Sequence, residues 1–221
     1  MNAKTMALLL GTALVALTGR AQTTTTVTFE PAVAAFEVQD KTTPPPANPI
    51  LFIGSSSVKR WTGLAEAFPG KSILQRGIDG TEVSDMIRYS PRIITPYRPT
   101  QVVVYAGDND IAQGKKTARD VYNGVLTLFM LVRKNLPGAL FTYISIKPSP
   151  SRRQYMAVQT EANNLIKNYL SGQRNTAFVD VYTPMLDAAG QPRPELFTAD
   201  SLHMNAAGYE VWKQAIAPVL K

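Results

Sequence analysis

The sequence has no cysteine and one histidine among its 221 residues. The lack of cysteine excludes disulfides, thiolate metal sites and a cysteine nucleophile. With His203 as the single imidazole, a metal site built from several histidines of one chain is also excluded. Any proton transfer through an imidazole must therefore use His203.

The sequence also lacks a membrane-length apolar run and a basic stripe. The longest apolar stretch, residues 6–17, is too short for a comfortable transmembrane span. The formal net charge is +7, but Lys and Arg are scattered, with pairs only at residues 115–116 and 152–153. We interpret these pairs as solvated surface, and we expect no nucleic-acid partner.

Residues 1–21 have the pattern of an export signal. Lys4 precedes the apolar stretch, and small residues at 19 and 21 favour cleavage after Ala21. Arg20 stands where a bacterial lipoprotein signal has cysteine, so lipid attachment is not available. We predict a periplasmic or secreted protein without stable membrane insertion once the signal is removed. A retained N-terminal anchor is the alternative.

Residues 22–49 are rich in Thr at one end and Pro at the other, which predicts a linker. Apolar residues at helical spacing predict a short helix over residues 29–36 within it. Residues 50–221 form the predicted single domain, which is long enough to bury a sizeable core.

Within this domain, short apolar runs alternate with helical patterns. The predicted strands are residues 50–53, 72–75, 101–106, 140–146 and 177–181. The predicted helices are residues 58–68, 82–89, 118–135, 152–171 and 206–220, with Pro91 interrupting the second and Asn205 capping the last. This alternation predicts an α/β fold, a three-layer α/β/α sandwich around a five-stranded parallel sheet.

Polar and Gly-rich sequences follow four of the predicted strands. They are Ser55-Ser56-Ser57, Arg-Gly-Ile-Asp-Gly at 76–80, Gly-Asp-Asn-Asp at 107–110, and Asp-Ser-Leu-His at 200–203. Each alone is an ordinary turn sequence. The carboxyl ends of parallel strands share one edge of the sheet, where ligands bind. The coincidence of all four at this edge favours a functional site.

The residue types at this edge suit acyl transfer. A serine becomes a strong nucleophile when a base takes its proton, and His203 is the imidazole available. Asp200 can orient that imidazole. The backbone N–H of Gly80, the amide of Asn109 and an N–H beside the serine can stabilise an oxyanion. These arguments leave open which serine of residues 55–57 reacts.

The four blocks together resemble the SGNH (GDSL-type) hydrolase superfamily over residues 50–221. Aligning the first block with the family's Gly-Asp-Ser places the nucleophile at Ser56, with Ser55 where Asp is usual. The other blocks place oxyanion donors at Gly80 and Asn109, and the remaining catalytic residues at Asp200 and His203. The N–H of Ser56 completes the implied oxyanion hole.

The resemblance is closest to bacterial proteins like platelet-activating-factor acetylhydrolase. It implies a flavodoxin-like strand order and serine esterase chemistry with neither metal nor cofactor. We expect small acyl esters as substrates, above all acetyl esters, including those of sugars. The alternatives are a lysophospholipase or other lipid esterase, a noncatalytic binding protein on the same scaffold, and a phosphate-binding flavodoxin-like domain.

Other residues near these blocks have simpler interpretations. We expect Asp79, Asp108 and Asp110 to hold turns and loops, and Trp61 to belong to the core beside the site. Arg76 is interpreted as a surface residue, with contact to an acidic substrate group as the alternative.

Overall fold

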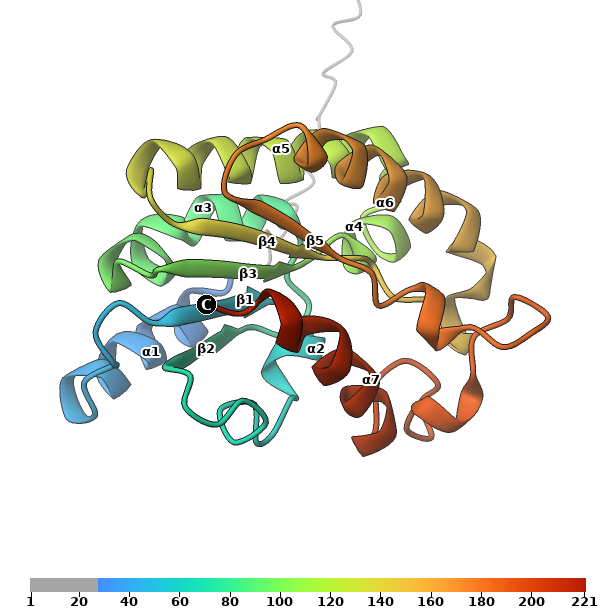
Figure 1. Ribbon diagram of the computed structural model, residues 1–221, viewed down its shortest axis with the longest axis horizontal. Coiled ribbons are helices and arrows are strands. Elements are labelled where there is room, and N and C mark those ends of the chain that lie inside the picture. Colours follow the sequence, from blue (N-terminus) through green and yellow to red (C-terminus); the bar gives the residue numbers. More distant parts are fainter. Residues whose placement is uncertain (1–27) are drawn as a thin grey trace, which may run out of the picture.

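The computed structural model describes residues 28–221, and its centre is a five-stranded sheet. The strands lie in the order β2-β1-β3-β4-β5, and every neighbouring pair is parallel (Figure 1). Their bounds are Ile50–Gly54 (β1), Ile73–Gly77 (β2), Gln101–Tyr105 (β3), Leu140–Ile144 (β4) and Thr176–Val179 (β5). The predicted fold class and the flavodoxin-like strand order are confirmed.

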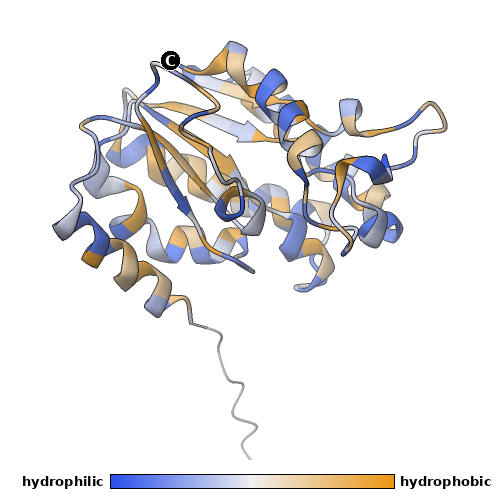
Figure 2. Cartoon of the chain, turned by 90° about the horizontal axis from the view of Figure 1, so that it is seen from below, coloured by the Kyte–Doolittle hydropathy of each residue, from blue (hydrophilic) through white to orange (hydrophobic). Residues whose placement is uncertain are grey.

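Helices cover both faces of the sheet. Their bounds are Glu30–Thr42 (α1), Ser56–Lys59 (α2), Val83–Ile93 (α3), Asp108–Ala112 (α4), Ala118–Asn135 (α5), Met156–Ser171 (α6) and Ala206–Ile216 (α7). One core forms between the sheet and α1, α3, α5 and α6; the other lies beneath α7 and the segment after α2. Figure 2 shows the orange of apolar residues along much of the sheet between these layers.

Capping residues explain why two helices begin where the sequence predicted. Thr117 and Asp120 form a reciprocal capping box at the start of α5, which has the predicted bounds. At the start of α7, the Asn205 side chain accepts the N–H of Ala207 at 2.9 Å and that of Gly208 at 3.2 Å.

The prediction of a helix over residues 58–68 is wrong beyond residue 59. Helix α2 ends at Lys59, and turns follow, with Gly63 in the left-handed region at φ 75°. Trp61 and Phe68 are nevertheless buried, because they pack with Phe52 in an aromatic cluster. Their apolar spacing reflects this cluster and not a helical face.

Pro91 does not interrupt α3, contrary to the prediction. The helix continues to Ile93 although Pro91 has no N–H to donate to the carbonyl of Ile87. The Ser90 hydroxyl donates to that carbonyl at 2.8 Å. A side-chain donor thus replaces the missing backbone one.

The helix predicted near the N-terminus is present and longer than expected, running from Glu30 to Thr42. Arg92 of α3 pairs with Glu30 at 2.7 Å and with Glu37 at 2.6 Å. Arg76 of β2 is buried against Asp40. This corrects the interpretation of Arg76 as a surface or substrate-binding residue, since its guanidinium fastens α1 to the sheet.

The predicted export signal, residues 1–21, lies outside the described residues. Within residues 28–221, every helix is too short or too polar to cross a bilayer.

Two glycines let α2 lie close to the sheet. Gly54 and Gly77 are paired across β1 and β2. A Cβ on Gly54 would lie 2.5 Å from the Tyr105 carbonyl oxygen, and one on Gly77 would lie 2.7 Å from Lys59 Cα. A side chain at Gly77 would therefore displace the backbone of α2, and one at Gly54 would displace the end of β3 and the Val58 side chain of α2.

We expect Gly77→Ala to lower the free energy of unfolding by about 1–3 kcal/mol, the usual cost of overpacking. Urea unfolding followed by circular dichroism measures this. Gly138→Ala is the matched control, because a Cβ there meets no atom within 4 Å. Equal stability of the two variants would contradict the proposed close approach of α2.

Candidate active site

The structure brings Ser56, His203 and Asp200 together at the carboxyl edge of the sheet. Ser56 opens α2, directly after β1, and His203 precedes α7. His203 Nε2 lies 3.0 Å from Ser56 Oγ, and His203 Nδ1 lies 2.5 Å from Asp200 Oδ2. The three side chains form one continuous chain of hydrogen bonds.

The acceptor character of the carboxylate fixes the direction of these bonds. An ionised Asp200 can only accept, so Nδ1 of His203 carries the proton. Nε2 of the neutral ring is then an acceptor, suited to receive the Ser56 hydroxyl proton. The arrangement is that of a serine with a positioned general base.

Hydrogen bonds hold Asp200 in its ionised form. Partial burial acts to raise the pKa of Asp200, but donors from His203, Leu202 and Thr198 outweigh it and hold the pKa well below its usual range. Besides Nδ1 of His203, these donors are the Leu202 N–H, the His203 N–H and the Thr198 hydroxyl, each at 2.9 Å. The loop thus pre-orients the carboxylate toward the imidazole.

Of the three consecutive serines, Ser56 contacts His203. Ser55 is the N-cap residue of α2 and is buried, with its N–H directed to the Tyr105 carbonyl at 3.3 Å. Ser57 is also buried, and its carbonyl accepts the Tyr209 hydroxyl at 3.1 Å. Ser56 is half-buried.

The turn that holds Gly80 and the short helix α4 that holds Asn109 are joined by a hydrogen bond. Gly80 lies in the turn after β2 with φ 78°, a conformation that favours glycine. The side-chain amide of Asn109, on α4, donates to the carbonyl of Thr81, the residue after Gly80, at 3.1 Å. An amide nitrogen has two hydrogens, so this bond leaves one for another acceptor.

Two of the acidic residues hold turns and loops in place, as expected. Asp79 pairs with Lys59 at 2.7 Å and with Arg60 at 3.4 Å, which fastens the turn after β2 to the end of α2. Asp110 accepts the N–H of Val83 at 3.1 Å, at the start of α3.

Asp108 belongs to a buried charged cluster that the sequence interpretation missed. Arg152 Nη1 lies 2.9 Å from Asp108 Oδ1, and Lys147 Nζ lies 3.5 Å from Asp108 Oδ2. Arg152 is 8% exposed, so the interpretation of residues 152–153 as solvated surface is wrong for Arg152. Both basic residues follow β4, and their position after a parallel strand is the sequence signal that points to this edge.

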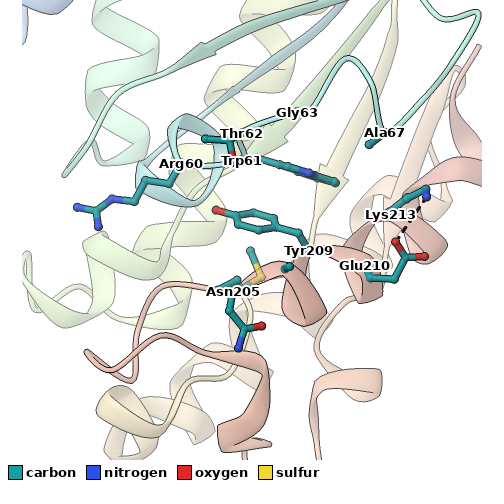
Figure 3. Close-up of a pocket in the computed structure, with 11 residues that line it drawn as sticks. Arg60, Trp61, Thr62, Gly63, Ala67, Asn205, Tyr209, Glu210 and Lys213 are labelled. Atoms are coloured by element: carbon teal, nitrogen blue, oxygen red, sulfur yellow. Dashed lines mark hydrogen bonds and ion pairs between the residues drawn. The ribbon is translucent and has the colours of Figure 1, made fainter.

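A pocket of about 430 Å³ lies between the segment that follows α2 and the first turns of α7 (Figure 3). Trp61 and Tyr209 stack along it, with ring centroids 5.1 Å apart, so Trp61 is core beside the site as predicted. Its polar lining includes Arg60, Thr62, Asn205, Glu210 and Lys213. Arg60 also reaches the catalytic edge, because its Nη1 lies 3.4 Å from His203 Nδ1.

Within residues 28–221, no three side chains of His, Asp or Glu group in a way that could hold a metal ion.

Residues 52–211 match the model of the GDSL-like lipase/acylhydrolase family. The chain belongs to this family and is a carboxylic ester hydrolase. The resemblance inferred from the four sequence blocks is thereby confirmed. A comparison with curated protein sequences finds no match.

Solved structures share the fold. A protein of Streptococcus pneumonia named for platelet activating factor is 24% identical with a TM-score of 0.75, and the match covers 87% of this chain and 92% of that one. A GDSL-like lipase of Bacteroides thetaiotaomicron is 20% identical with a TM-score of 0.70, covering 84% and 95%. A catalytic mutant of an acetylxylan esterase from Geobacillus stearothermophilus is 15% identical with a TM-score of 0.64, covering 79% and 94%.

We expect the stability advantage of the wild type over Asp200→Asn to shrink as the pH falls from about 5 to about 3. The pKa of Asp200 is lower in the folded state, so its contribution is full above the unfolded pKa and is lost as the carboxylate is protonated. The advantage is small, because the side chain is 45% exposed.

Urea unfolding at a series of pH values measures this difference. Glu161→Gln, which changes an exposed acid on α6, is the control. A difference between the wild type and Asp200→Asn that stays constant or widens at low pH would contradict the proposed stabilisation of the ionised carboxylate.

Proposed function

We propose that the chain is a serine esterase in which Ser56 is the nucleophile, His203 the general base and acid, and Asp200 the residue that orients the imidazole. The observation that carries this proposal is the unbroken hydrogen-bond chain from Ser56 Oγ through both ring nitrogens of His203 to Asp200. A noncatalytic binding protein or a phosphate-binding domain gives no reason for this arrangement.

The chemistry follows from the hydrogen-bond directions. Ser56 Oγ attacks the ester carbonyl carbon while its proton passes to His203 Nε2, which gives a tetrahedral intermediate and an imidazolium. The imidazolium returns the proton to the leaving alcohol as the C–O bond breaks, leaving an acyl-enzyme. Water, deprotonated by His203, then attacks the acyl carbon, and Ser56 leaves with the proton. The products are the alcohol and the carboxylic acid.

The proposed oxyanion donors come from three elements. They are the N–H of Ser56 at the start of α2, the N–H of Gly80 after β2, and the remaining amide hydrogen of Asn109 on α4. Such donors act because they are oriented before the charge develops.

The proposed substrates are small acyl esters, chiefly acetyl esters, carried on polar alcohols such as sugars. The pocket between the segment after α2 and the start of α7 supports this, because side chains with hydrogen-bonding groups line much of it. The fold shared with an acetylxylan esterase is consistent with this substrate class. The pattern of residues 1–21 supports action outside the cytoplasm.

We expect Ser56→Ala to lower kcat for p-nitrophenyl acetate by at least roughly 10⁴-fold, because no other group replaces the nucleophile. Circular dichroism should show an unchanged fold. A fluorophosphonate probe should label the wild type on Ser56 and leave Ser56→Ala unlabelled, as mass spectrometry of peptides would show.

Ser57→Ala is the matched control, because Ser57 contacts Tyr209 through its backbone carbonyl. This variant should keep activity near that of the wild type. Full activity in Ser56→Ala with loss in Ser57→Ala would move the nucleophile to Ser57. Full activity in His203→Ala would overturn the esterase mechanism itself.

We expect kcat/KM for p-nitrophenyl acetate to exceed that for p-nitrophenyl octanoate by about tenfold or more, since a site for small acyl groups gains little from a longer apolar chain. Acetate release from acetylated xylo-oligosaccharides and fatty-acid release from lysophosphatidylcholine compare the two substrate classes directly. A preference for octanoate or for the lysophospholipid would establish the lipid-esterase alternative.

A further inference from the structure

The amide of Asn109 is held at both ends by groups within the protein. Its nitrogen donates to the Thr81 carbonyl at 3.1 Å, and its oxygen accepts from Arg152 Nη2 at 3.2 Å. Asn109 and Arg152 are both buried. The two contacts fix which end of the amide faces which neighbour, because a flipped amide would place its nitrogen against the guanidinium.

Arg152 is in turn held by Asp108, the residue before Asn109 on α4. The guanidinium reaches Asp108 through Nη1 and Asn109 through Nη2, so one planar group spans two consecutive side chains. Gln159 of α6 also donates to Asp108 Oδ1, at 3.2 Å. The three elements that meet here are α4, α6 and the 3₁₀ segment Pro150–Tyr155.

The positive charge of Arg152 also strengthens the Asn109 amide as a hydrogen-bond donor. A guanidinium on the carbonyl oxygen of an amide draws electron density toward that oxygen, and the amide N–H groups become better donors. Burial strengthens this effect, because little water screens the charge. The free hydrogen of Asn109 is the one proposed for the oxyanion.

We propose that Arg152 is a positioning residue for the oxyanion hole, which orients and polarises the Asn109 amide while Asp108 holds the guanidinium in place. This inference rests on the proposed esterase mechanism. It gives a role to the loop after β4, and it assigns Arg152 no contact with the substrate.

The test uses Arg152→Gln, with Arg153→Gln as the matched control, since Arg153 is the exposed neighbour on the same segment. We expect Arg152→Gln to lower kcat for p-nitrophenyl acetate by about 10- to 100-fold with little change in KM, because the loss falls on the transition state. Arg153→Gln should match the wild type.

Phenylboronic acid supplies a second readout. Its boron accepts a bond from Ser56 Oγ, the serine proton passes to His203, and the tetrahedral boronate carries the negative charge. The inhibition constant should rise in Arg152→Gln by a factor close to the loss in kcat. A purely structural defect would lower the amount of active enzyme and leave the inhibition constant unchanged.

A double-mutant cycle with Asn109→Ala decides whether Arg152 acts through Asn109. We expect Arg152→Gln to have little further effect on kcat in the Asn109→Ala background. An equal loss in both backgrounds, or an unchanged kcat and inhibition constant in Arg152→Gln alone, would overturn the proposal. If Arg152→Gln does not fold, Arg152→Lys is judged by the same criteria, because lysine keeps the charge but lacks the fork that spans both partners.

The failure of the esterase proposal has a different signature. In that case neither the wild type nor Arg153→Gln hydrolyses p-nitrophenyl acetate or other esters. Activity in both, with an Arg152→Gln variant that matches them, would overturn the role of Arg152 alone.

Discussion

The close approach of α2 to the ends of β1 and β2 is the constraint on which the site depends. Because Gly77 carries no side chain, the backbone of residues 58–59 can lie directly against it, and the bare Gly54 beside it leaves room for the Val58 side chain. This packing sets where α2 begins, and hence where Ser56 Oγ points. A shift of α2 by the width of a methyl group would exceed the tolerance of a 3.0 Å hydrogen bond to His203.

The two halves of the site are held by different kinds of interaction. Backbone hydrogen bonds from the Asp200 loop orient the carboxylate and keep it ionised, and the Asn205 cap fixes the start of α7 just beyond His203. The proposed oxyanion donor Asn109, by contrast, lies beside buried charged groups. Burial lowers the pKa of Lys147, and the nearby Asp108 carboxylate acts against that effect. Buried charges contribute little net stability, so their presence next to Asn109 favours an orienting role.

The sequence was sufficient for the strand order and for the residues that meet at the catalytic edge. Parallel strands force the loops after β1, β2 and β3 to one edge, so the positions of Ser56, Gly80 and Asn109 could be inferred without coordinates. The single histidine left one choice of base. The resemblance to a family then selected the middle serine, and the contact between Ser56 and His203 agrees with that selection.

The features that could not be predicted from the sequence are those that depend on tertiary contacts or on a neighbouring side chain. The apolar spacing at residues 58–68 fits a helix, but Trp61 and Phe68 instead complete an aromatic cluster around Phe52. Pro91 is a helix breaker by rule, yet the Ser90 hydroxyl satisfies the carbonyl it leaves free. Arg152 and Arg153 are not distinguished by the sequence, but Arg152 is buried because it contacts Asp108 and Asn109.

The burial of Arg152, but not of Arg153, also bears on how Asn109 is oriented in the proposed oxyanion hole. Asn109 sits on α4, a helix of five residues, too short to fix a side chain by its own hydrogen bonds. Gly107, in the left-handed region at φ 104°, turns the chain from β3 into this helix. The orientation of Asn109 must therefore come from outside α4. The Thr81 carbonyl supplies it from β2's loop, and the Arg152 guanidinium supplies it from β4's loop. The loops after β2 and β4, the strands that flank β1 and β3 in the sheet, thus both contact the Asn109 amide.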